Sequence, residues 1–390
     1  MNTKDIRKET PGCDNLIHFN NAGSSIMPNC VIEAMEEHLK LEQKIGAYSA
    51  ERESVHLIDQ LYSEAAKLIN AKPDEIAYVE NATRAWDMVF YGLPFQKGDN
   101  IITAQAEYSS NYVAMLQVAK RHSLDIHIIP NNEYGEVDVE KLKQTINEKT
   151  KLIAVTHIPT NNGLINPVKE VGQIAKEKNI LFLLDACQSL GHIPVDVMEI
   201  GCDFLVATGR KYLRAPRGTG LLYVRSKPMQ SIEPAFLDIK SVSSVTQTEY
   251  TLREDAKRYE CWESNVAAKI GLGYAIKYLN SLTIKETSQR VLQLADYLRS
   301  ELSQIEGTTV LDRGRCKSGI VTFIASKSPL EIHTECEKMG IHLSISNLTN
   351  ARLDNPPYQY NSVLRASLHY FNTKDEIDKF TSVLKKILLK

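Results

Sequence analysis

Several features are scarce in this chain of 390 residues, and each scarcity narrows the possible classes of protein. Cysteine occurs seven times without a CxxC pair, which argues against a zinc site or a disulfide framework and suits a reducing compartment. Apolar runs such as NILFLLDA are short and interrupted, too short to cross a bilayer. The first residues, MNTKDIRKETPG, lack the apolar segment of a secretory signal peptide. We therefore expect a cytoplasmic protein that contacts no membrane.

An excess of one charge is also missing. The formal net charge is −2, and basic and acidic residues are mixed along the chain, so we expect no surface that binds nucleic acid. Apolar residues make up 43% and charged residues 24%, which is ordinary for a globular protein. The length exceeds what one small core needs and suits a large domain with a smaller one.

What the sequence does contain is an alternation of short apolar runs with amphipathic helical segments. The runs are rich in Val, Ile and Leu, and they are EIAYVE, DNIITAQ, LDIHIIP, KLIAVTHI, ILFLLDA, CDFLVATG and TGLLYVR. Helical periodicity lies between most of them, which predicts an α/β fold with a mostly parallel sheet covered on both faces. We expect an N-terminal arm over 1–28 that packs on the small domain, a large domain over 29–282 and a small α+β domain over 283–390. One long helical stretch is expected from Val266 to Ile305.

Polar residues follow these strands at the point where each strand ends. They are Thr83, Glu107 and Tyr108, Thr160 and Asn161, Asp185, and Thr208 with Lys211. In an open α/β sheet, ligands collect at the carboxyl ends of the strands, so we expect these side chains to lie together.

Lys211 and Asp185 suggest the chemistry of this edge. Taken alone, Lys211 would be a surface lysine and Asp185 a helix cap. A lysine near other cations, here Arg210 and Arg214, has a lowered pKa and can form an imine. A buried aspartate can pair with a protonated pyridine nitrogen, and Thr208 with the arginines suits a phosphate. Together these are the parts of a pyridoxal 5'-phosphate (PLP) site, and no metal ion is expected.

Five motifs carry a resemblance to a known family: HFNNAG, VENATRAWD, DACQSLG, ATGRKYLRAPRGTGLLYVR and VLRASLHYFNTKDEID. Over residues 17–385 the chain resembles the class V aminotransferases of PLP fold type I. Within them it is most similar to the branch of cysteine desulfurases, selenocysteine lyases, cystine C–S lyases and isopenicillin-N-epimerase-like proteins. The resemblance implies a seven-stranded, mostly parallel sheet between helices, a small α+β C-terminal domain and a homodimer that acts on an amino acid.

The resemblance also implies a role for each matching residue. Lys211 would form the imine with the cofactor and later move the Cα proton, and Asp185 would pair with the ring nitrogen. The other cofactor-binding residues would be Ala82, Thr83, Thr208 and Arg210 at the phosphate, Tyr108 on the ring face, and Gln188 with Thr160 or Asn161 at the phenolic oxygen. Asn21, Ala22 and Arg365 would contact the substrate, with Arg365 holding its carboxylate.

Two departures from the family pattern bear on the reaction. Desulfurases of this branch carry a cysteine nucleophile on a loop before the carboxylate-binding arginine, but residues 344–363 contain no cysteine. The preceding cysteine, Cys336, lies in a predicted helix, and Cys187 lies beside the ring position. Trp262 and Glu263 stand where the family often has a Gly-Thr pair that reaches the partner's phosphate.

Four hypotheses about function therefore remain open at this point. The first is a C–S lyase that acts by β-elimination without a persulfide cysteine, and the second is an aminotransferase, for which Arg84 and Arg352 could hold a second carboxylate. The third is an amino-acid epimerase with Tyr48, His342 or His369 as a second base. The fourth is a catalytically silent binding protein, which the joint presence of Lys211, Asp185 and Arg365 disfavours.

Overall fold

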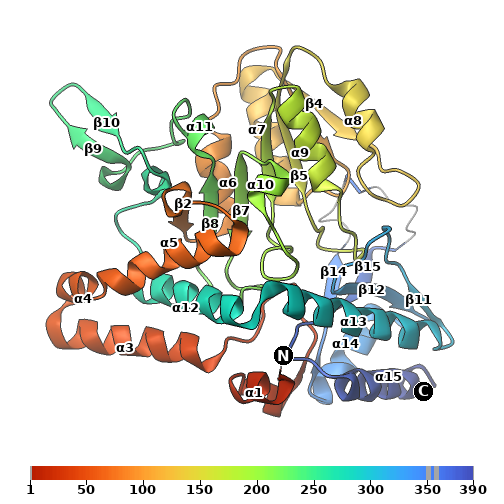
Figure 1. Ribbon diagram of the computed structural model, residues 1–390. Helices are drawn as coiled ribbons and strands as arrows, with labels where there is room; N and C mark the ends of the chain where they lie inside the picture. Colours follow the sequence, from red (N-terminus) through yellow and green to blue (C-terminus); the bar gives the residue numbers. More distant parts are fainter. Residues whose placement is uncertain (1, 348–352, 355–359, 390) are drawn as a thin grey trace.

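A seven-stranded sheet forms the centre of the larger part of the chain (Figure 1). The structure, a computed structural model, describes residues 2–347, 353–354 and 360–389. In spatial order the strands are β2 (Ile76–Val79), β8 (Gly220–Val224), β7 (Phe204–Thr208), β6 (Leu181–Asp185), β5 (Thr150–Thr156), β3 (Asn100–Ala104) and β4 (Asp125–Ile129). Only β8 is antiparallel to its neighbours, because the connection over 209–219 is too short for a crossover. The predicted α/β fold with a mostly parallel sheet is confirmed.

Alternating apolar residues bury both faces of this sheet. Ile102, Phe182 and Leu205 pack into one apolar cluster, whereas Ile101 and Leu183 pack into the other. The covering helices are α6 (Ala82–Phe90), α7 (Ser109–His122), α8 (Val139–Thr145), α9 (Val168–Glu177), α10 (Val197–Ile200) and α11 (Ser226–Met229). The period of two in the strands therefore places the sheet between two layers of helix.

A second group of helices runs below the sheet in the view of Figure 1. It consists of α3 (Asn29–Ile45), α4 (Ala47–Glu53), α5 (Val55–Ile69), α12 (Val266–Leu282) and α13 (Ile284–Ser303). The helical stretch expected from Val266 is present but is divided into two helices, since Thr283 has a φ of +65° and separates α12 from α13. A residue with a positive φ interrupts the regular helical hydrogen bonds, so α12 ends before it and α13 begins after it.

The C-terminal part contains a four-stranded antiparallel sheet with its own apolar cluster. Its strands are, in spatial order, β11 (Thr308–Val310), β12 (Ile320–Ala325), β15 (Ser362–Ser367) and β14 (Ser344–Asn347). Helices α14 (Pro329–Lys338) and α15 (Lys374–Leu389) pack with α13 around it. The division of the chain at residues 282 and 283 stays a prediction.

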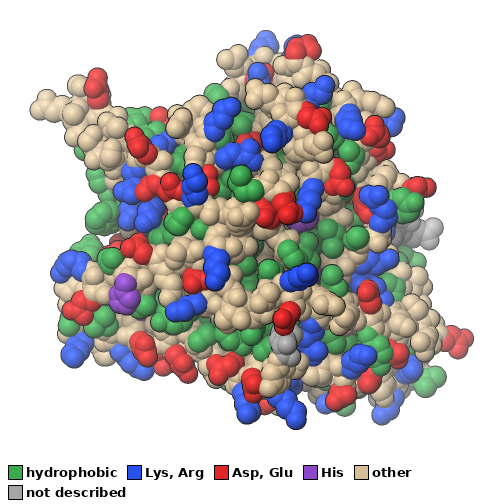
Figure 2. Space-filling model, viewed as in Figure 1, with side chains coloured by type: hydrophobic (Ala, Val, Ile, Leu, Met, Phe, Trp, Pro, Cys, Tyr) green, Lys and Arg blue, Asp and Glu red, His purple; other side chains and the backbone are tan. Residues whose placement is uncertain are grey.

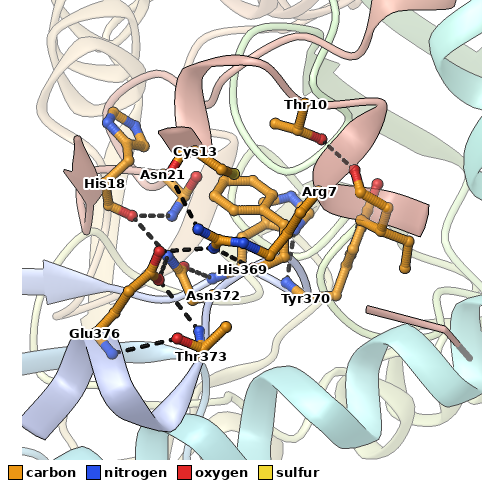
Figure 3. Close-up of polar contacts among 12 residues, drawn as sticks. Arg7, Thr10, Cys13, His18, Asn21, His369, Tyr370, Asn372, Thr373 and Glu376 are labelled. Atoms are coloured by element: carbon orange, nitrogen blue, oxygen red, sulfur yellow. Dashed lines mark hydrogen bonds and ion pairs between the residues drawn. The ribbon is translucent and has the colours of Figure 1, made fainter. Parts of the chain in front are cut away.

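The N-terminal arm contains α1 (Thr3–Lys8), α2 (Gly12–Asn15) and the short strand β1 (Ile17–His18), which pairs with β13 (Ile341–His342). Figure 3 shows how this arm is joined to the C-terminal segment. Arg7 donates to Glu376 over 2.6 Å and to the carbonyl of Phe371 over 3.0 Å. Asn372 donates to the carbonyl of His18 over 3.2 Å. The arm is thus held against residues that follow it by more than 350 positions.

A hairpin that the sequence did not predict projects from the body. It consists of β9 (Val242–Val245) and β10 (Tyr250–Leu252). The 3-10 turn Ile239–Ser241 precedes the hairpin, and the 3-10 turn Ala256–Tyr259 follows it. Elsewhere, a third 3-10 turn, Pro73–Glu75, precedes β2. Figures 1 and 2 show it at the upper left, where it stands away from the sheet. Over the face drawn in Figure 2, basic and acidic side chains are interspersed.

Two further findings on the described residues concern membranes and metal ions. No helix among them is long and apolar enough to cross a membrane. Within the same residues, no group of three or more His, Cys, Asp and Glu side chains is placed to hold a metal ion.

Candidate active site

A cavity of about 140 Å³ opens at the carboxyl edge of the large sheet, where five segments of the chain meet. It is lined by Asn81, Ala82, Thr83, Tyr108, Thr156, Ile158, Thr160, Asp185, Cys187, Gln188, Thr208, Arg210 and Lys211. All the predicted cofactor-binding residues except Asn161 are in this lining. A larger hollow of about 980 Å³ beside Lys72 and Arg225 lies at the opposite edge of the sheet and contains no predicted site residue.

One end of the cavity is built to hold an anion. Helix α6 begins there, with the side chain of Asn81 accepting from the N–H of Arg84 over 2.9 Å. The N–H groups of Ala82 and Thr83 belong to the first turn, which has no partner within the helix and favours a phosphate. Strand β8 can approach this helix start because residue 220 is glycine, where a Cβ atom would lie 3.1 Å from the carbonyl carbon of Asn81. A glycine in β8 therefore helps to shape the anion end.

Lys211 lies in the connection between β7 and β8 and lines the same cavity. The turn is held in place by its backbone, since Arg214 donates its N–H to the Lys211 carbonyl over 3.0 Å. The Lys211 amine makes no hydrogen bond or ion pair with any residue that the structure describes. Burial lowers the pKa of Lys211 below the usual 10.5, and the guanidinium of Arg210 adds to this effect. The amine is thus available both as a nucleophile and as a base.

Arg210, just before this lysine, lines the cavity while one guanidinium nitrogen donates to the carbonyl of Gly23 in the arm. The backbone N–H of Ser25 in turn donates to the Arg210 carbonyl over 2.8 Å. Arg210 therefore joins the arm to the anion end of the cavity and adds a permanent positive charge there.

Asp185 ends strand β6 and is buried in the cavity wall. Its Oδ1 accepts from the N–H of Cys187 over 2.9 Å, and its Oδ2 accepts from the side chain of Asn111 over 2.8 Å. No cation lies within ion-pair distance of it in the described part of the chain. Because an unpaired buried carboxylate is costly, this position suits a cation supplied by a ligand.

Gln188, Thr160 and Asn161 were expected at the phenolic oxygen of the cofactor. Gln188 donates to the carbonyl of Ala22 over 3.0 Å and leaves its Oε1 without a partner among the described residues. Thr160 lines the cavity, whereas Asn161 is buried beside it with both side-chain polar atoms unpaired within the described chain. Thr160 is therefore the residue of this pair that lines the cavity, and the role of both at the phenolic oxygen stays a prediction. Tyr108, expected on the ring face, precedes α7 and is 43% exposed.

Arg365, the predicted carboxylate-binding residue, lies in β15 and faces the cavity rim. Its Nη1 donates to the Thr160 hydroxyl over 2.7 Å, and its Nη2 donates to the Asn20 side chain over 3.4 Å. Its Nε is buried and has no partner in the described residues. Although burial lowers the pKa of Arg365 to about 10, the group stays protonated at neutral pH. An unpaired guanidinium N–H here suits a carboxylate.

Asn21 and Ala22 were expected to contact the substrate, yet their polar atoms bind the protein itself. Asn21 donates to the carbonyl of Ser367 over 2.7 Å, and the N–H of Ala22 donates to the Ser367 hydroxyl over 2.8 Å. They fasten the arm to β15. Asn20, which belongs to the same HFNNAG motif but was not singled out within it, is the residue that contacts Arg365.

Other functional residues also escaped the sequence reasoning. Asn81, Thr156 and Ile158 line the cavity, and Asn111 contacts Asp185 from helix α7. The N-cap role of Asn81 was readable from its place before ATRAW. The contact of Asn111 with Asp185 depends on tertiary packing, and only its place four residues after Glu107 hinted at it.

These features fit PLP on physical grounds. The cavity offers an unpaired amine, an unpaired buried carboxylate and a helix N-terminus next to an arginine. Those groups match the aldehyde, the ring nitrogen and the phosphate of PLP in chemical type.

Comparisons with known proteins agree with this reading. The family model of the aminotransferase class V proteins matches residues 17–380. A probable cysteine desulfurase of Methanothermobacter thermautotrophicus is 31% identical over 398 residues, which cover 99% of this chain and 98% of that protein. A second probable cysteine desulfurase, from Pyrococcus abyssi, is 30% identical over 99% of this chain and 97% of its own length.

Solved structures lead to the same family. The apo cysteine desulfurase of Thermococcus onnurineus superposes with a TM-score of 0.92 at 26% identity, over 99% of this chain and 98% of that one. The cystine C–S lyase C-DES, solved with its product cysteine persulfide, gives a TM-score of 0.86 at 25% identity, over 96% and 99%. A C-DES variant in this group carries glycine covalently linked to PLP. The chain therefore belongs to the class V aminotransferase family, has the fold of PLP fold type I enzymes and is itself a PLP-dependent enzyme.

Proposed function

We propose that this enzyme is a C–S lyase that eliminates a sulfur leaving group from Cβ of a cysteine-derived amino acid without forming a persulfide on itself. The observation that carries the proposal is that the cavity has the groups needed to hold PLP and substrate, whereas the loop before Arg365 has no cysteine to accept sulfur. Lys211 and Asp185 line the cavity, Arg365 contacts the lining residue Thr160, and residues 344–363 contain no cysteine.

The chemistry that PLP would supply in this cavity is a sink for the electron pair released at Cα of the substrate. The Lys211 amine holds the cofactor covalently before substrate arrives and afterwards takes the Cα proton. Asp185 keeps the ring nitrogen protonated through its carboxylate. The start of α6, Thr208 and Arg210 hold the phosphate, and Tyr108 covers the ring.

The substrate is oriented by its carboxylate. Arg365 offers the unpaired Nε–H, and its Nη atoms are steadied by Thr160 and Asn20. A cysteine conjugate held in this way releases a thiol from Cβ, and with water the remaining carbon skeleton becomes pyruvate and ammonia. This reaction thus needs a residue that binds the substrate carboxylate and a base, but no protein thiol.

Cysteine desulfuration is the second candidate, because several relatives are cysteine desulfurases or probable ones. The cysteines of the described chain argue against it. Cys336 is fully buried in α14, where burial raises its pKa to about 12. Cys187 lines the cavity, but burial and the adjacent Asp185 raise its pKa well above the usual value. A thiol that stays protonated is a poor sulfur acceptor.

Epimerisation loses support from the positions of its expected second bases. His369 accepts at Nδ1 from the N–H of Tyr370 over 2.9 Å and lies 3.2 Å through Nε2 from the Tyr212 carbonyl. Tyr48 and His342 are not in the cavity lining.

The residues considered for an aminotransferase give it no specific support. Arg84 stacks over the ring of Phe236 at 3.8 Å and donates to Cys261, so it has protein partners already. Arg352 lies outside the described residues, as does Tyr358 of the same loop. Transamination is therefore left as an outcome of the test below.

We also propose that the enzyme is a homodimer that acts in the cytoplasm. Around the hairpin, Val245, Phe236 and Trp262 expose apolar side chains, which a second copy could cover. Glu263, next to Trp262, is exposed and would not hold a phosphate while ionised. Light scattering that gives the mass of one chain would contradict the dimer.

The test follows the absorption of the purified holoenzyme during reaction with L-cysteine, cystine and cysteine S-conjugates, without a keto acid. The lyase predicts that the starting spectrum returns while pyruvate and ammonia accumulate. A spectrum stranded in the amine form of the cofactor would identify an aminotransferase instead. Mass spectrometry of the protein after turnover with cysteine checks for a persulfide, and Cys187→Ala is the matched variant. A mass increase of one sulfur atom would establish desulfuration.

A further inference from the structure

Glu107 is a second buried carboxyl group behind Asp185, and the proposed function leaves it without a role. It follows β3 and is only 3% exposed. Its Oε1 accepts three hydrogen bonds, from the N–H of Tyr108 over 2.7 Å, from Asn111 over 2.9 Å and from the Thr156 hydroxyl over 2.7 Å. No cation pairs with it among the described residues.

Asn111 joins the two carboxyl groups directly. Its Nδ2 donates to Oε1 of Glu107 over 2.9 Å and to Oδ2 of Asp185 over 2.8 Å. The two hydrogens of one amide nitrogen are thus divided between two acids. Since Asn111 is itself buried, at 4% exposure, no water competes for these bonds.

The hydrogen bonds of Glu107 are asymmetric, which leaves a place for a proton. All three donors lie at Oε1, while Oε2 has a single neighbour, the hydroxyl of Thr103 at 3.2 Å. A hydroxyl accepts as readily as it donates, so a proton on Oε2 can be directed to Thr103. Two carboxylates that share one dry site rarely ionise together.

The surroundings of Glu107 contain few charges. Asp185, at the end of β6, is the charged group that faces it, while Thr103 from β3, Thr156 from β5 and Asn111 from α7 are neutral. Lys211 and Cys187 act on Asp185 from the side of the cavity. Burial first, and the charge of Asp185 second, raise the pKa of Glu107 to about 7, against the effect of its three hydrogen bonds.

We propose that Glu107, Asn111 and Asp185 form a buried relay in which the protonation of Glu107 sets the charge that Asp185 presents to the ring nitrogen of the cofactor. The relay rests on the proposed function, in which Asp185 faces that nitrogen. With Glu107 protonated, the carboxylate of Asp185 has no second negative charge behind it. With Glu107 ionised, a second negative charge stands behind Asp185 and strengthens the hold of the ring nitrogen on its proton. Glu107 is therefore a positioning residue that acts through Asn111.

The experiment uses holoenzyme loaded with PLP that carries ¹⁵N in its ring, and it follows the ring-nitrogen chemical shift as pH is varied. Wild-type protein is expected to show a step with a midpoint near the pKa of Glu107, about 7. Glu107→Gln, which is neutral and equal in shape, should lose that step. Glu75→Gln is the matched control, since Glu75 is buried at the other edge of the sheet, where it accepts from Ser226 over 2.7 Å. The step should persist in this variant.

Asn111→Ala is a second variant that keeps the test valid if Glu107→Gln does not fold. Removing a donor to the carboxylate should raise the midpoint, by about one pH unit. A step that persists in Glu107→Gln, or a midpoint unmoved in Asn111→Ala, overturns the relay. Failure of the wild-type protein to bind PLP through Lys211 would instead defeat the proposed function, so the two failures are distinguishable.

Discussion

Two regions of this molecule bury polar side chains in quite different ways. At the joint between the N-terminal arm and the C-terminal segment, polar groups are paired with protein (Figure 3). Arg7 donates to Glu376, Phe371 and Cys13. Arg214, which is 1% exposed, donates to the carbonyl of Ile26, the hydroxyl of Tyr370 and the hydroxyl of Thr10.

At the cavity, by contrast, several buried or partly buried polar groups have no partner in the described part of the chain. These are the Lys211 amine, the Nε of Arg365, the Oε1 of Gln188 and the side-chain amide of Asn161. A buried polar atom without a hydrogen bond costs about 1–3 kcal/mol, which folding alone gives no reason to tolerate. The joint is thus organised for stability, whereas the cavity is organised for a ligand.

The comparison predicts that substitutions in the cavity remove function and those in the joint remove stability. The largest effect is expected for Lys211→Ala. Without its base and its covalent link to the cofactor, the enzyme should lose activity by about 10³-fold or more. Its melting temperature without PLP should not fall, because burial of an unpaired ammonium does not favour folding. Borohydride reduction followed by mass spectrometry should find no cofactor attached; attachment at another lysine would refute the assignment.

Arg365→Lys should have the next largest effect. Lysine keeps the charge but lacks the planar fork that binds a carboxylate through two hydrogen bonds. We expect kcat/KM to fall by about 10²-fold, or about 3 kcal/mol, while PLP binding stays unchanged. Steady-state kinetics measures the first and cofactor absorbance the second. An unchanged kcat/KM would move the carboxylate site elsewhere.

These cavity residues were also the ones most readily predicted from the sequence. Asp185 and Lys211 follow buried strands, and the polarity of a parallel sheet brings strand ends together whatever the details of packing. The central sheet was also predictable, because short runs rich in Val, Ile and Leu that alternate with amphipathic helices are typical of a parallel sheet buried on both faces.

Contacts set by tertiary packing were not accessible in this way. Asn20 rather than Asn21 contacts Arg365 because the arm pairs with β15 in one register, which the sequence does not encode locally. The break at Thr283 requires a threonine with a positive φ, which helix periodicity does not anticipate. The bridge of Asn111 to Asp185 depends on how α7 packs against β6.

In the joint, Arg7→Ala should reduce stability rather than catalysis. It removes a hydrogen-bonded ion pair with Glu376 that is largely buried, so we expect a loss of about 2–3 kcal/mol in the free energy of unfolding. Urea denaturation measures this loss, and the bound PLP spectrum should not change. Lys40→Ala is the matched control, because its ion pair with Glu36 is exposed and should contribute nothing measurable. Equal losses in both variants would contradict the comparison.

The smallest effect concerns His192, which connects the two regions. Its Nδ1 lies 2.9 Å from the Gln188 carbonyl in the cavity wall, and its Nε2 accepts from the N–H of Gly319 in the C-terminal part. Burial lowers the pKa of His192 to about 3, below the value of about 6.5 in an unfolded chain. The unfolded state therefore binds the extra proton first as pH falls. Stability from this group is complete above about pH 6.5 and decreases below it, by about 2 kcal/mol at pH 5.

His192→Gln tests this assignment, because glutamine offers a donor and an acceptor without titrating. Its free energy of unfolding, measured by urea denaturation at several pH values, should be lower than that of the wild type near neutrality. Below about pH 6 it should also fall less steeply with pH, because the unfolded variant takes up about one proton fewer than the unfolded wild type. His122→Gln is the control, since His122 is exposed near the end of α7. The same pH dependence in wild type and His192→Gln would show that His192 does not carry the acid sensitivity. A weaker dependence of stability on pH in His192→Gln would show that the neutral imidazole of His192 stabilises the contact between the cavity wall and the C-terminal part, which contains Arg365.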